Sequence, residues 1–140
     1  MSGYEVETVS VDGRTTAVGS AGPFTLVVDR PAEAGGGGLG FSGGQLLNMA
    51  VAGCISNDLF REAARAGIAL RRVRVMARSD YGGDPAVSSP IEYEVEVEGD
   101  AAPDALQELV ERVDRIAEIP NSLRGGTDVR LTSVRTNASR

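Results

Sequence analysis

The segment FSGGQLLNMAVAGCISNDLFREAARAG, from Phe41 to Gly67, decides the fold of this chain. Ser42 is followed three residues later by Gln45, a spacing that predicts a capping box at the start of a helix. Gly67 stands where a residue in the left-handed conformation would end that helix. About 24 residues lie between these signals, enough for a helix about 35 Å long. We therefore expect the rest of the chain to be organised around one long helix.

The first half of this helix is almost entirely apolar. From Leu46 to Ile55 the only strongly polar side chain is Asn48, and a helix that is apolar on all sides is expected to be buried on all sides. After Cys54 the segment becomes amphipathic, which argues against a membrane span. Its expected polar side carries Arg61, Glu62 and Arg65. Cys54 is the only cysteine of the chain and lies in the middle of the helix.

The length and composition limit the class of protein. A chain of 140 residues predicts a single domain, residues 1–140. We find no pattern of a signal peptide at the N-terminus. A single cysteine excludes an intrachain disulfide, which fits a cytoplasmic protein. The net charge of −6, from 14 basic and 20 acidic residues, argues against nucleic acid or an anionic membrane as the main partner.

Two absent residue types exclude several chemistries. The sequence has no His and no Lys, so all of its basic residues are Arg. This removes Ser-His-Asp triads, Cys-His pairs, Schiff bases, the lysine of phosphate loops and histidine metal sites. A zinc site would need three carboxylates beside the one cysteine, an improbable combination. We therefore expect neither a metal nor a cofactor.

The N-terminal third predicts strands followed by a loop. Residues 4–11 and 14–18 flank Asp12-Gly13, a dipeptide typical of two-residue hairpin turns in which both residues have positive φ. Residues 24–28 predict a third strand, with Phe24, Leu26 and Val28 on one face. Residues 32–44 then form a glycine-rich loop that leads into the long helix.

This loop contains the string Gly38-x-Gly40-x-x-Gly43, which matches the dinucleotide-binding pattern. The context is wrong for that site, because the preceding strand stops about ten residues earlier and an antiparallel hairpin comes before it. We therefore interpret the segment as a flexible loop that passes close to other backbone.

The second half of the chain predicts two more strands, a helix and a closing strand. Residues 70–81 and 91–99 alternate, so an arginine face should lie beside a glutamate face on a solvated antiparallel pair. Pro103 should begin an amphipathic helix, residues 119–122 should break it, and residues 128–136 should form the last strand. The predicted fold is α+β, with antiparallel sheets around the long buried helix.

The amount of chain available also predicts an oligomer. Fewer than about 115 residues would have to cover a helix of about 35 Å on every side, and many of them are polar. Two chains packed around paired central helices would solve this shortage. We therefore expect an obligate homodimer.

Several stretches resemble a known family. The glycine-rich loop is followed by GGQLLNMAVAGCISND (43–58), then by AARAGI (63–68) and later by AEIPNSL (117–123), and together they resemble the OsmC/Ohr family of bacterial peroxide-defence proteins. The resemblance implies an intertwined α+β homodimer with active sites at the subunit interface. It also implies that the thiolate of Cys54 attacks the O–O bond of an organic hydroperoxide, releasing an alcohol and leaving a sulfenic acid.

The sequence departs from the family pattern at the residues that assist this cysteine. The resolving cysteine of the family belongs to a Cys-Pro pair, and here that pair is Ile119-Pro120. The family glutamate falls on Gly44, and the family arginine falls near Val11, with Arg14 close by but not aligned. The resemblance therefore assigns neither of these two roles to a residue of this chain.

A thiol among apolar neighbours needs a nearby cation in order to ionise. From sequence alone the candidates are Arg14, Arg124 or an arginine of a partner chain.

Two functions remain open at this stage. The first is a one-cysteine, thiol-dependent organic hydroperoxide reductase that uses Cys54 and an external thiol reductant. An apolar pocket between the two helices would then favour alkyl or lipid hydroperoxides. The alternative is a non-catalytic OsmC-like dimer that binds an apolar small molecule.

Overall fold

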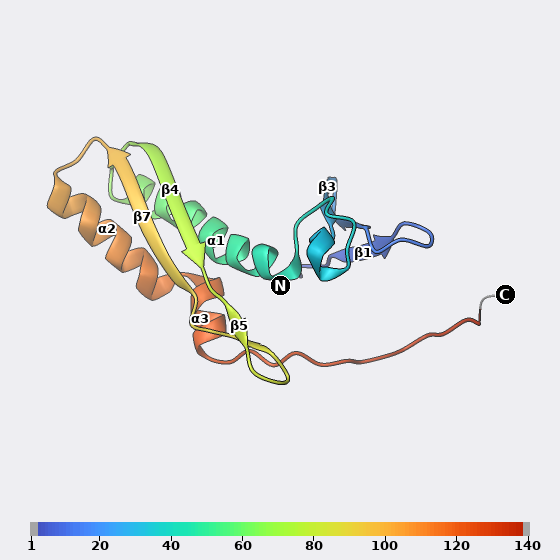
Figure 1. Cartoon of the computed structure of the whole chain (residues 1–140). Coiled ribbons are helices and arrows are strands. Elements are labelled where there is room, and N and C mark those ends of the chain that lie inside the picture. The colour runs from blue at the N-terminus through green and yellow to red at the C-terminus, as the bar shows by residue number, and fades with distance from the viewer. Residues whose placement is uncertain (1–2, 139–140) are drawn as a thin grey trace. The chain divides into compact units, whose positions relative to one another are not determined.

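The long central helix is present with the predicted ends. The computed structural model describes residues 3–138, and in it helix α1 spans Gly43–Arg65 (Figure 1). The Ser42 amide donates to Oε1 of Gln45 over 2.9 Å, and the Gln45 amide donates to the Ser42 hydroxyl over 3.3 Å. Gly67 has a φ of 70°, and the Ile68 amide donates to the carbonyl of Ala63 over 2.8 Å. The predicted capping box and the predicted glycine end are both confirmed.

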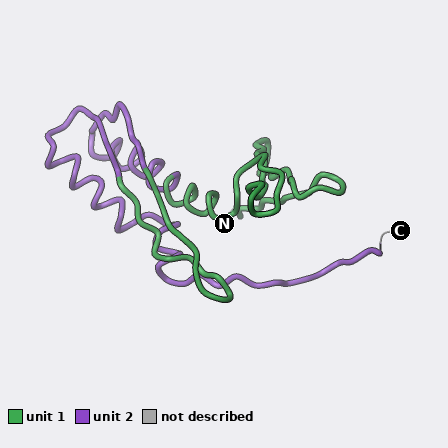
Figure 2. The backbone as a smooth tube through the Cα atoms, in the orientation of Figure 1, with its two compact units in different colours: residues 1–52, 76–94 green, residues 53–75, 95–140 purple. Residues whose placement is uncertain are grey.

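The chain divides into two compact units, which Figure 2 distinguishes by colour. Unit 1 comprises residues 1–52 and 76–94, and unit 2 comprises residues 53–75 and 95–140. Helix α1 and the strands β4 (Leu70–Arg78) and β7 (Glu92–Gly99) continue along the chain from one unit into the other. We describe each unit by itself.

Unit 1 contains a three-stranded antiparallel sheet in the order β1-β2-β3. Its strands are β1 (Glu7–Ser10), β2 (Ala17–Ala21) and β3 (Phe24–Val28), so the predicted hairpin and third strand are confirmed. The predicted two-residue turn is wrong. Residues 11–16 form a longer loop in which the backbone amide of Arg14 donates a hydrogen bond to the carbonyl of Val11 over 2.9 Å. Only Gly13 has positive φ there, because a single left-handed glycine is sufficient for this turn.

The glycine-rich loop lies against β3 and contains a short 3-10 helix, η1 (Ala32–Ala34). A Cβ atom at Gly36 would overlap the Arg30 carbonyl, and one at Gly40 would overlap the Val27 carbonyl. The predicted close passage to other backbone is therefore confirmed, and it explains why these positions are glycine.

Asp29, at the end of β3, organises this loop. Its carboxylate accepts hydrogen bonds from the hydroxyls of Thr15 (3.0 Å) and Thr16 (2.8 Å). It also accepts hydrogen bonds from the backbone amides of Arg30, Gly37 and Leu39. These bonds hold the pKa of Asp29 well below its ordinary value of 3.8, with the hydroxyl of Thr16 as the largest cause. The loop that was expected to be flexible is thus anchored by a buried carboxylate.

Strands β4 and β7 form a two-stranded sheet that carries the predicted ladder of charges. Within unit 2, Arg74 lies 3.3 Å from Glu96, and Arg72 lies 3.9 Å from Glu98. The glutamate number falls as the arginine number rises, as an antiparallel pair requires. The arginine and glutamate side chains are exposed, so the expected solvated sheet surface is confirmed. In unit 1 the connection between these strands contains a small hairpin, β5 (Tyr81–Gly82) and β6 (Val87–Ser88).

Unit 2 packs the second half of α1 with helix α2 (Pro103–Ile116), which is drawn in orange in Figure 1. Pro103 is the first helical residue, as predicted. The buried apolar side chains come from both helices and from the residue that ends α2. They are Ile55, Leu59, Ala63, Leu109, Val113 and Ala117.

Two predictions for the C-terminal region are wrong. The expected turn at 119–122 belongs to helix α3 (Glu118–Arg124), because Ala117 (ψ 127°) ends α2 and Pro120 lies in the first turn of α3, where its missing N–H costs nothing. Residues 128–136 form no strand in the described chain. The side chains of Val129 and Leu131 are 97% and 82% exposed. Among the described residues, no neighbouring strand pairs with the backbone of this segment.

The first half of α1, which was expected to be buried on all sides with the help of a second chain, is only partly covered in the single chain, where Met49 is 50% exposed. In the amphipathic second half, Phe60 is 47% exposed. The buried residues of α1 form one face, which consists of Val51, Ile55, Asp58, Leu59, Glu62 and Ala63. Within the described residues, no helix combines the length and the apolar character that crossing a membrane requires.

Candidate functional site

Cys54 lies in the middle of α1, within unit 2, and is partly exposed. Its neighbour Gly53 faces open space, since a Cβ atom added there would meet nothing within 4 Å. The helix places Asp58 one turn after Cys54 on the same face, and Arg61 one turn after Asp58. The only thiol of the chain is therefore accessible, and charged side chains follow it along one face of the helix.

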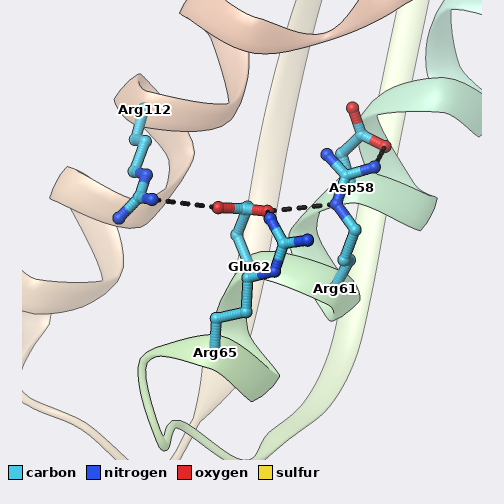
Figure 3. Close-up of polar contacts among 5 residues, drawn as sticks. All are labelled: Asp58, Arg61, Glu62, Arg65 and Arg112. Atoms are coloured by element: carbon cyan, nitrogen blue, oxygen red, sulfur yellow. Dashed lines mark hydrogen bonds and ion pairs between the residues drawn. The ribbon is translucent and has the colours of Figure 1, made fainter.

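Asp58 has one engaged oxygen and one free oxygen. Its Oδ1 atom lies 3.2 Å from Nη1 of Arg61, while Oδ2 is buried and accepts no hydrogen bond within the described residues. The residue is only 7% exposed. In Figure 3 the free oxygen points away from the neighbouring Glu62. A buried carboxylate oxygen without a donor is costly, so this atom is a candidate site for a further interaction.

Glu62 is buried at the centre of three arginines (Figure 3). Its Oε2 atom lies 3.0 Å from Nε of Arg61 and 2.9 Å from Nη1 of Arg65, and its Oε1 atom lies 3.1 Å from Nη2 of Arg112. The hydrogen bond from Arg61 is the main cause that lowers the pKa of Glu62, and the charges of Arg65 and Arg112 add to it. Glu62 is therefore a buried anion that joins α1 to α2 through Arg112.

The sequence analysis missed this cluster because it assigned Glu62 to the polar side of the helix. The spacing contained the correct signal. Glu62 follows Ile55 by seven residues and Leu59 by three, which places it on the same buried face. Asp58, four residues after Cys54, is also buried, and the sequence analysis assigned it to neither face.

The residues that sequence reasoning considered as partners of Cys54 have other environments. Arg124 joins α3 to α2, with Nη2 2.7 Å from Oδ1 of Asp114. Arg14 lies in the loop between β1 and β2 of unit 1. Ile119, at the position of the family's resolving cysteine, lies in the first turn of α3. Its neighbour Glu118 lies close enough to Arg61 to contribute to the raised pKa of that arginine, although the hydrogen bond to Glu62 is the largest cause.

Gly44, at the position of the family glutamate, is covered by Tyr81. A Cβ atom at residue 44 would lie 3.1 Å from Cε2 of Tyr81 and 3.4 Å from its hydroxyl oxygen. Both residues belong to unit 1. A side chain at this position would require the tyrosine ring to shift by a few tenths of an ångström, so the glycine allows the close approach of the ring.

Two hollows lie away from the thiol. One, of about 230 Å³, is lined mainly by apolar groups of the β1-β2-β3 sheet and by Leu46 of α1, all in unit 1. The other, of about 220 Å³, lies between the end of α1 and α2 in unit 2, and its lining includes Ile68, Leu109, Glu108 and Arg112. The expected pocket between the two helices therefore has a mixed lining rather than an apolar one. Cys54 lines neither hollow.

The described residues contain no group of three or more His, Cys, Asp or Glu side chains that could hold a metal ion. The reactive group that the site offers is the partly exposed thiol of Cys54.

Fold and site together define an α+β protein in which a long helix carries one accessible thiol. Residues 35–132 match the family model described as OsmC-like protein. The chain belongs to the OsmC-like family, and the resemblance seen in the sequence is confirmed. A search of curated proteins gave no match.

Solved structures share this fold at low sequence identity. An OsmC-like protein from Mycoplasma pneumoniae superimposes with a TM-score of 0.72 at 15% identity, with 90% of each chain covered. The organic hydroperoxide resistance protein OhrB of Bacillus subtilis gives 0.64 at 19% identity, covering 89% of this chain and 92% of its own. An organic hydroperoxide resistance protein OsmC from Legionella pneumophila gives 0.62 at 18% identity, covering 89% and 91%. At these identities the similarity shows the fold alone.

Proposed function

We propose that this protein is a one-cysteine, thiol-dependent organic hydroperoxide reductase. The Cys54 thiolate attacks the O–O bond of the hydroperoxide, so that one oxygen is transferred to sulfur and the other leaves as the alcohol. The chain has no second cysteine, so an external thiol reduces the sulfenic acid, forming first a mixed disulfide with loss of water and then a free Cys54. Such a cycle suits the reducing cytoplasm.

One observation carries this proposal. In a member of the OsmC-like family, the single thiol of the chain is partly exposed on α1 rather than sealed in the core. A structural cysteine is usually buried and inert, whereas a reactive one needs access to its substrate. The two hydroperoxide resistance proteins that share the fold support the same reaction class.

The reductase is proposed to act as a homodimer. Met49 and Phe60 are large apolar side chains on α1 that a single chain leaves about half exposed. Residues 127–138 add Val129, Leu131 and Val134, which are exposed in a segment without a strand neighbour. A second copy that covers α1 and pairs with this segment would bury these side chains. The strand expected at 128–136 would then form only in the dimer.

A second candidate function rests on the hollow of unit 1. Phe24, Leu26 and Leu46 contribute to its mainly apolar lining, and Cys54 does not take part. Together with Ile119 at the position of the resolving cysteine and Gly44 at the position of the family glutamate, this hollow favours a non-catalytic dimer that binds an apolar small molecule.

Titration of the reduced protein with cumene hydroperoxide separates the two functions, with Cys54→Ser as the control. Intact mass and residual peroxide are followed together. The reductase consumes one equivalent of peroxide rapidly as Cys54 gains one oxygen, and the serine variant does neither. Peroxide consumption no faster than that by free cysteine would overturn the reductase function. The non-catalytic dimer that binds an apolar small molecule would then be the remaining candidate.

A further inference from the structure

The inference concerns the outer edge of β1 and the C-terminal segment formed by residues 128–136. β1 is an end strand of the β1-β2-β3 sheet, so one of its edges has no strand partner among the described residues. The Val11 amide donates to the Thr16 carbonyl over 2.8 Å, and along an antiparallel strand the direction of the backbone groups alternates. The backbone groups of Thr8 therefore point away from β2, toward the open edge.

The segment 128–136 exposes groups that match such an edge. Within residues 3–138 it takes part in no backbone-to-backbone hydrogen bond, and no strand lies beside it. Val129 and Leu131 alternate with Arg130, so an extended segment places the two apolar side chains on one face and the arginine on the other. An open strand edge and an unpaired extended segment are the two halves of a β-augmentation interface.

Two hollows flank β1, and they differ in character. The mainly apolar hollow of about 230 Å³ includes Val6 and Thr8 in its lining. A more polar hollow of about 450 Å³ lies along the same strand, and Glu5 and Glu7 contribute to its lining. No ion pair among the described residues involves either glutamate. Because side chains alternate along a strand, β1 has one face with Val6 and Thr8 and one acidic face.

We propose that residues 128–136 of a second copy of this chain add to the free edge of β1 as an antiparallel strand. The proposal rests on the homodimer proposed above and names the surface that each chain offers to the other. By two-fold symmetry each chain gives one segment and receives one. In the register that matches both faces, three pairs of residues lie opposite each other: Leu131 and Val6, Arg130 and Glu7, and Val129 and Thr8. The apolar side chains of the segment then lie on the side of the apolar hollow.

The other strand edges suit the segment less well. On the exposed face of β4, arginines such as Arg74 would repel Arg130. The glutamates of β7 are already paired across the sheet, as Glu96 is with Arg74. The outer edge of β3 is occupied by Phe41. Because an exposed ion pair contributes little to affinity, the charges select the edge, and the backbone hydrogen bonds and apolar side chains hold the segment.

Engineered cysteines test this pairing in a Cys54→Ser background, which has no native thiol. Opposite residues of an antiparallel pair have Cα atoms roughly 4.5–5.5 Å apart, a separation that a disulfide can bridge. On mild oxidation, Val6→Cys combined with Leu131→Cys should convert most of the protein to a covalent dimer, measured by intact mass. Val95→Cys combined with Leu131→Cys is the matched control, because Val95 lies on β7, which also has a free edge, and it should give no covalent dimer.

Each other outcome of the oxidation contradicts the proposal. A disulfide within one chain would assign the segment to its own β1 and exclude the second copy as its partner. A covalent dimer with the cysteine on β7 and none with the cysteine on β1 would move the contact to the other sheet. If light scattering shows a dimer in which the cysteine at position 6 stays unlinked, the homodimer holds and this surface is wrong. None of these readouts involves hydroperoxide reduction, so the reductase stands or falls separately.

Hydrogen exchange covers the case in which the cysteine variants fail to fold. The Thr8 amide should exchange at least about tenfold more slowly in the wild type than in Leu131→Ser, which removes an apolar side chain from the proposed strand. The Val11 amide, which is bonded to the Thr16 carbonyl within one chain, is the internal control and should exchange equally in both proteins. Equal exchange of Thr8 in a dimeric wild type and a monomeric variant would rule out the added strand.

Discussion

Nη2 of Arg112, on α2, lies 3.1 Å from Oε1 of Glu62, on α1, and the Glu62 side chain is only 1% exposed. This pair joins the two helices of unit 2 through a carboxylate that also binds Arg61 and Arg65. Breaking one partner of a buried ion cluster is more costly than losing an exposed pair, because the remaining charges stay desolvated.

The first prediction concerns Glu62→Gln. Loss of the charge leaves three arginines around a neutral side chain, so the melting temperature should fall by several degrees. Glu96→Gln, in the exposed ladder of β4 and β7, is the matched control and should change it little. Thermal unfolding followed by circular dichroism measures both. Equal effects of the two substitutions would contradict the buried-anion role of Glu62.

The second prediction is the pH dependence of the same cluster. The pKa of Glu62 is lowered in the folded protein from an ordinary value of 4.5. Its contribution to stability is therefore fully present above pH 4.5 and is lost as the pH falls through the lowered folded pKa. Urea midpoints measured from pH 6 down to about pH 2 should fall more steeply for the wild type than for Glu62→Gln. Parallel curves would show that Glu62 is not the titrating group.

The third prediction concerns the anchor of the glycine-rich loop. Asp29→Asn replaces an oxygen that accepts donors with an amide that donates, so the loop from residue 30 to 41 should open more often. Hydrogen exchange at the amides of Gly37 and Leu39 should accelerate by about tenfold or more. The Gln45 amide, protected by its own capping box, is the internal control. Unchanged exchange at Gly37 would mean that the glycine backbone alone holds the loop.

The fourth prediction tests the contact between Gly44 and Tyr81 with a double-mutant cycle. Gly44→Ala gains helix propensity but presses against the tyrosine ring, so the two effects should largely cancel. In a Tyr81→Ala background the same substitution should stabilise the protein by about 0.5 kcal/mol. Chemical denaturation of the four proteins gives the coupling free energy. If the free-energy effects of the two substitutions are additive, the tyrosine ring moves aside without a cost in stability.

The fifth prediction tests the proposed dimer. Light scattering should give the wild type twice its chain mass of 14.6 kDa. Leu131→Ser places a hydroxyl where the second chain would bury an apolar side chain, and it should shift the protein toward monomer. Arg130→Ala, in the same segment, removes only a contact with Asp128 and should leave the dimer intact. A wild type that is monomeric at all concentrations would overturn the dimer.

Local signals in the sequence predicted the elements well. The capping box at Ser42, the glycine end at Gly67 and the Pro103 helix start depend on residues within a few positions of one another. The alternation of charges on residues 70–81 and 91–99 likewise predicted the exposed sheet face and its ladder, although the strands are shorter, Leu70–Arg78 and Glu92–Gly99. These features depend on backbone groups and near neighbours, and a single sequence contains that information.

The candidate site was only partly predictable. Cys54 and its place on the helix followed from the sequence, but the burial of Glu62 and the free oxygen of Asp58 did not. A glutamate beside two arginines of its own helix looks like part of a solvated helix face until α2, which carries Arg112, is placed against it. The strand expected at 128–136 failed for a related reason, because a strand needs a neighbour as well as a suitable sequence.

The sequence by itself determined the family, the long helix with both of its ends, and the position of the only thiol, because these depend on local hydrogen bonding and residue identity. The tertiary structure alone decided that Asp29 would anchor the glycine-rich loop, that Tyr81 would cover Gly44, and that Glu62 would become a buried anion. Those outcomes depend on which distant segments meet and exclude water. The electrostatics of a carboxylate change with its surroundings, and those surroundings come from other parts of the fold.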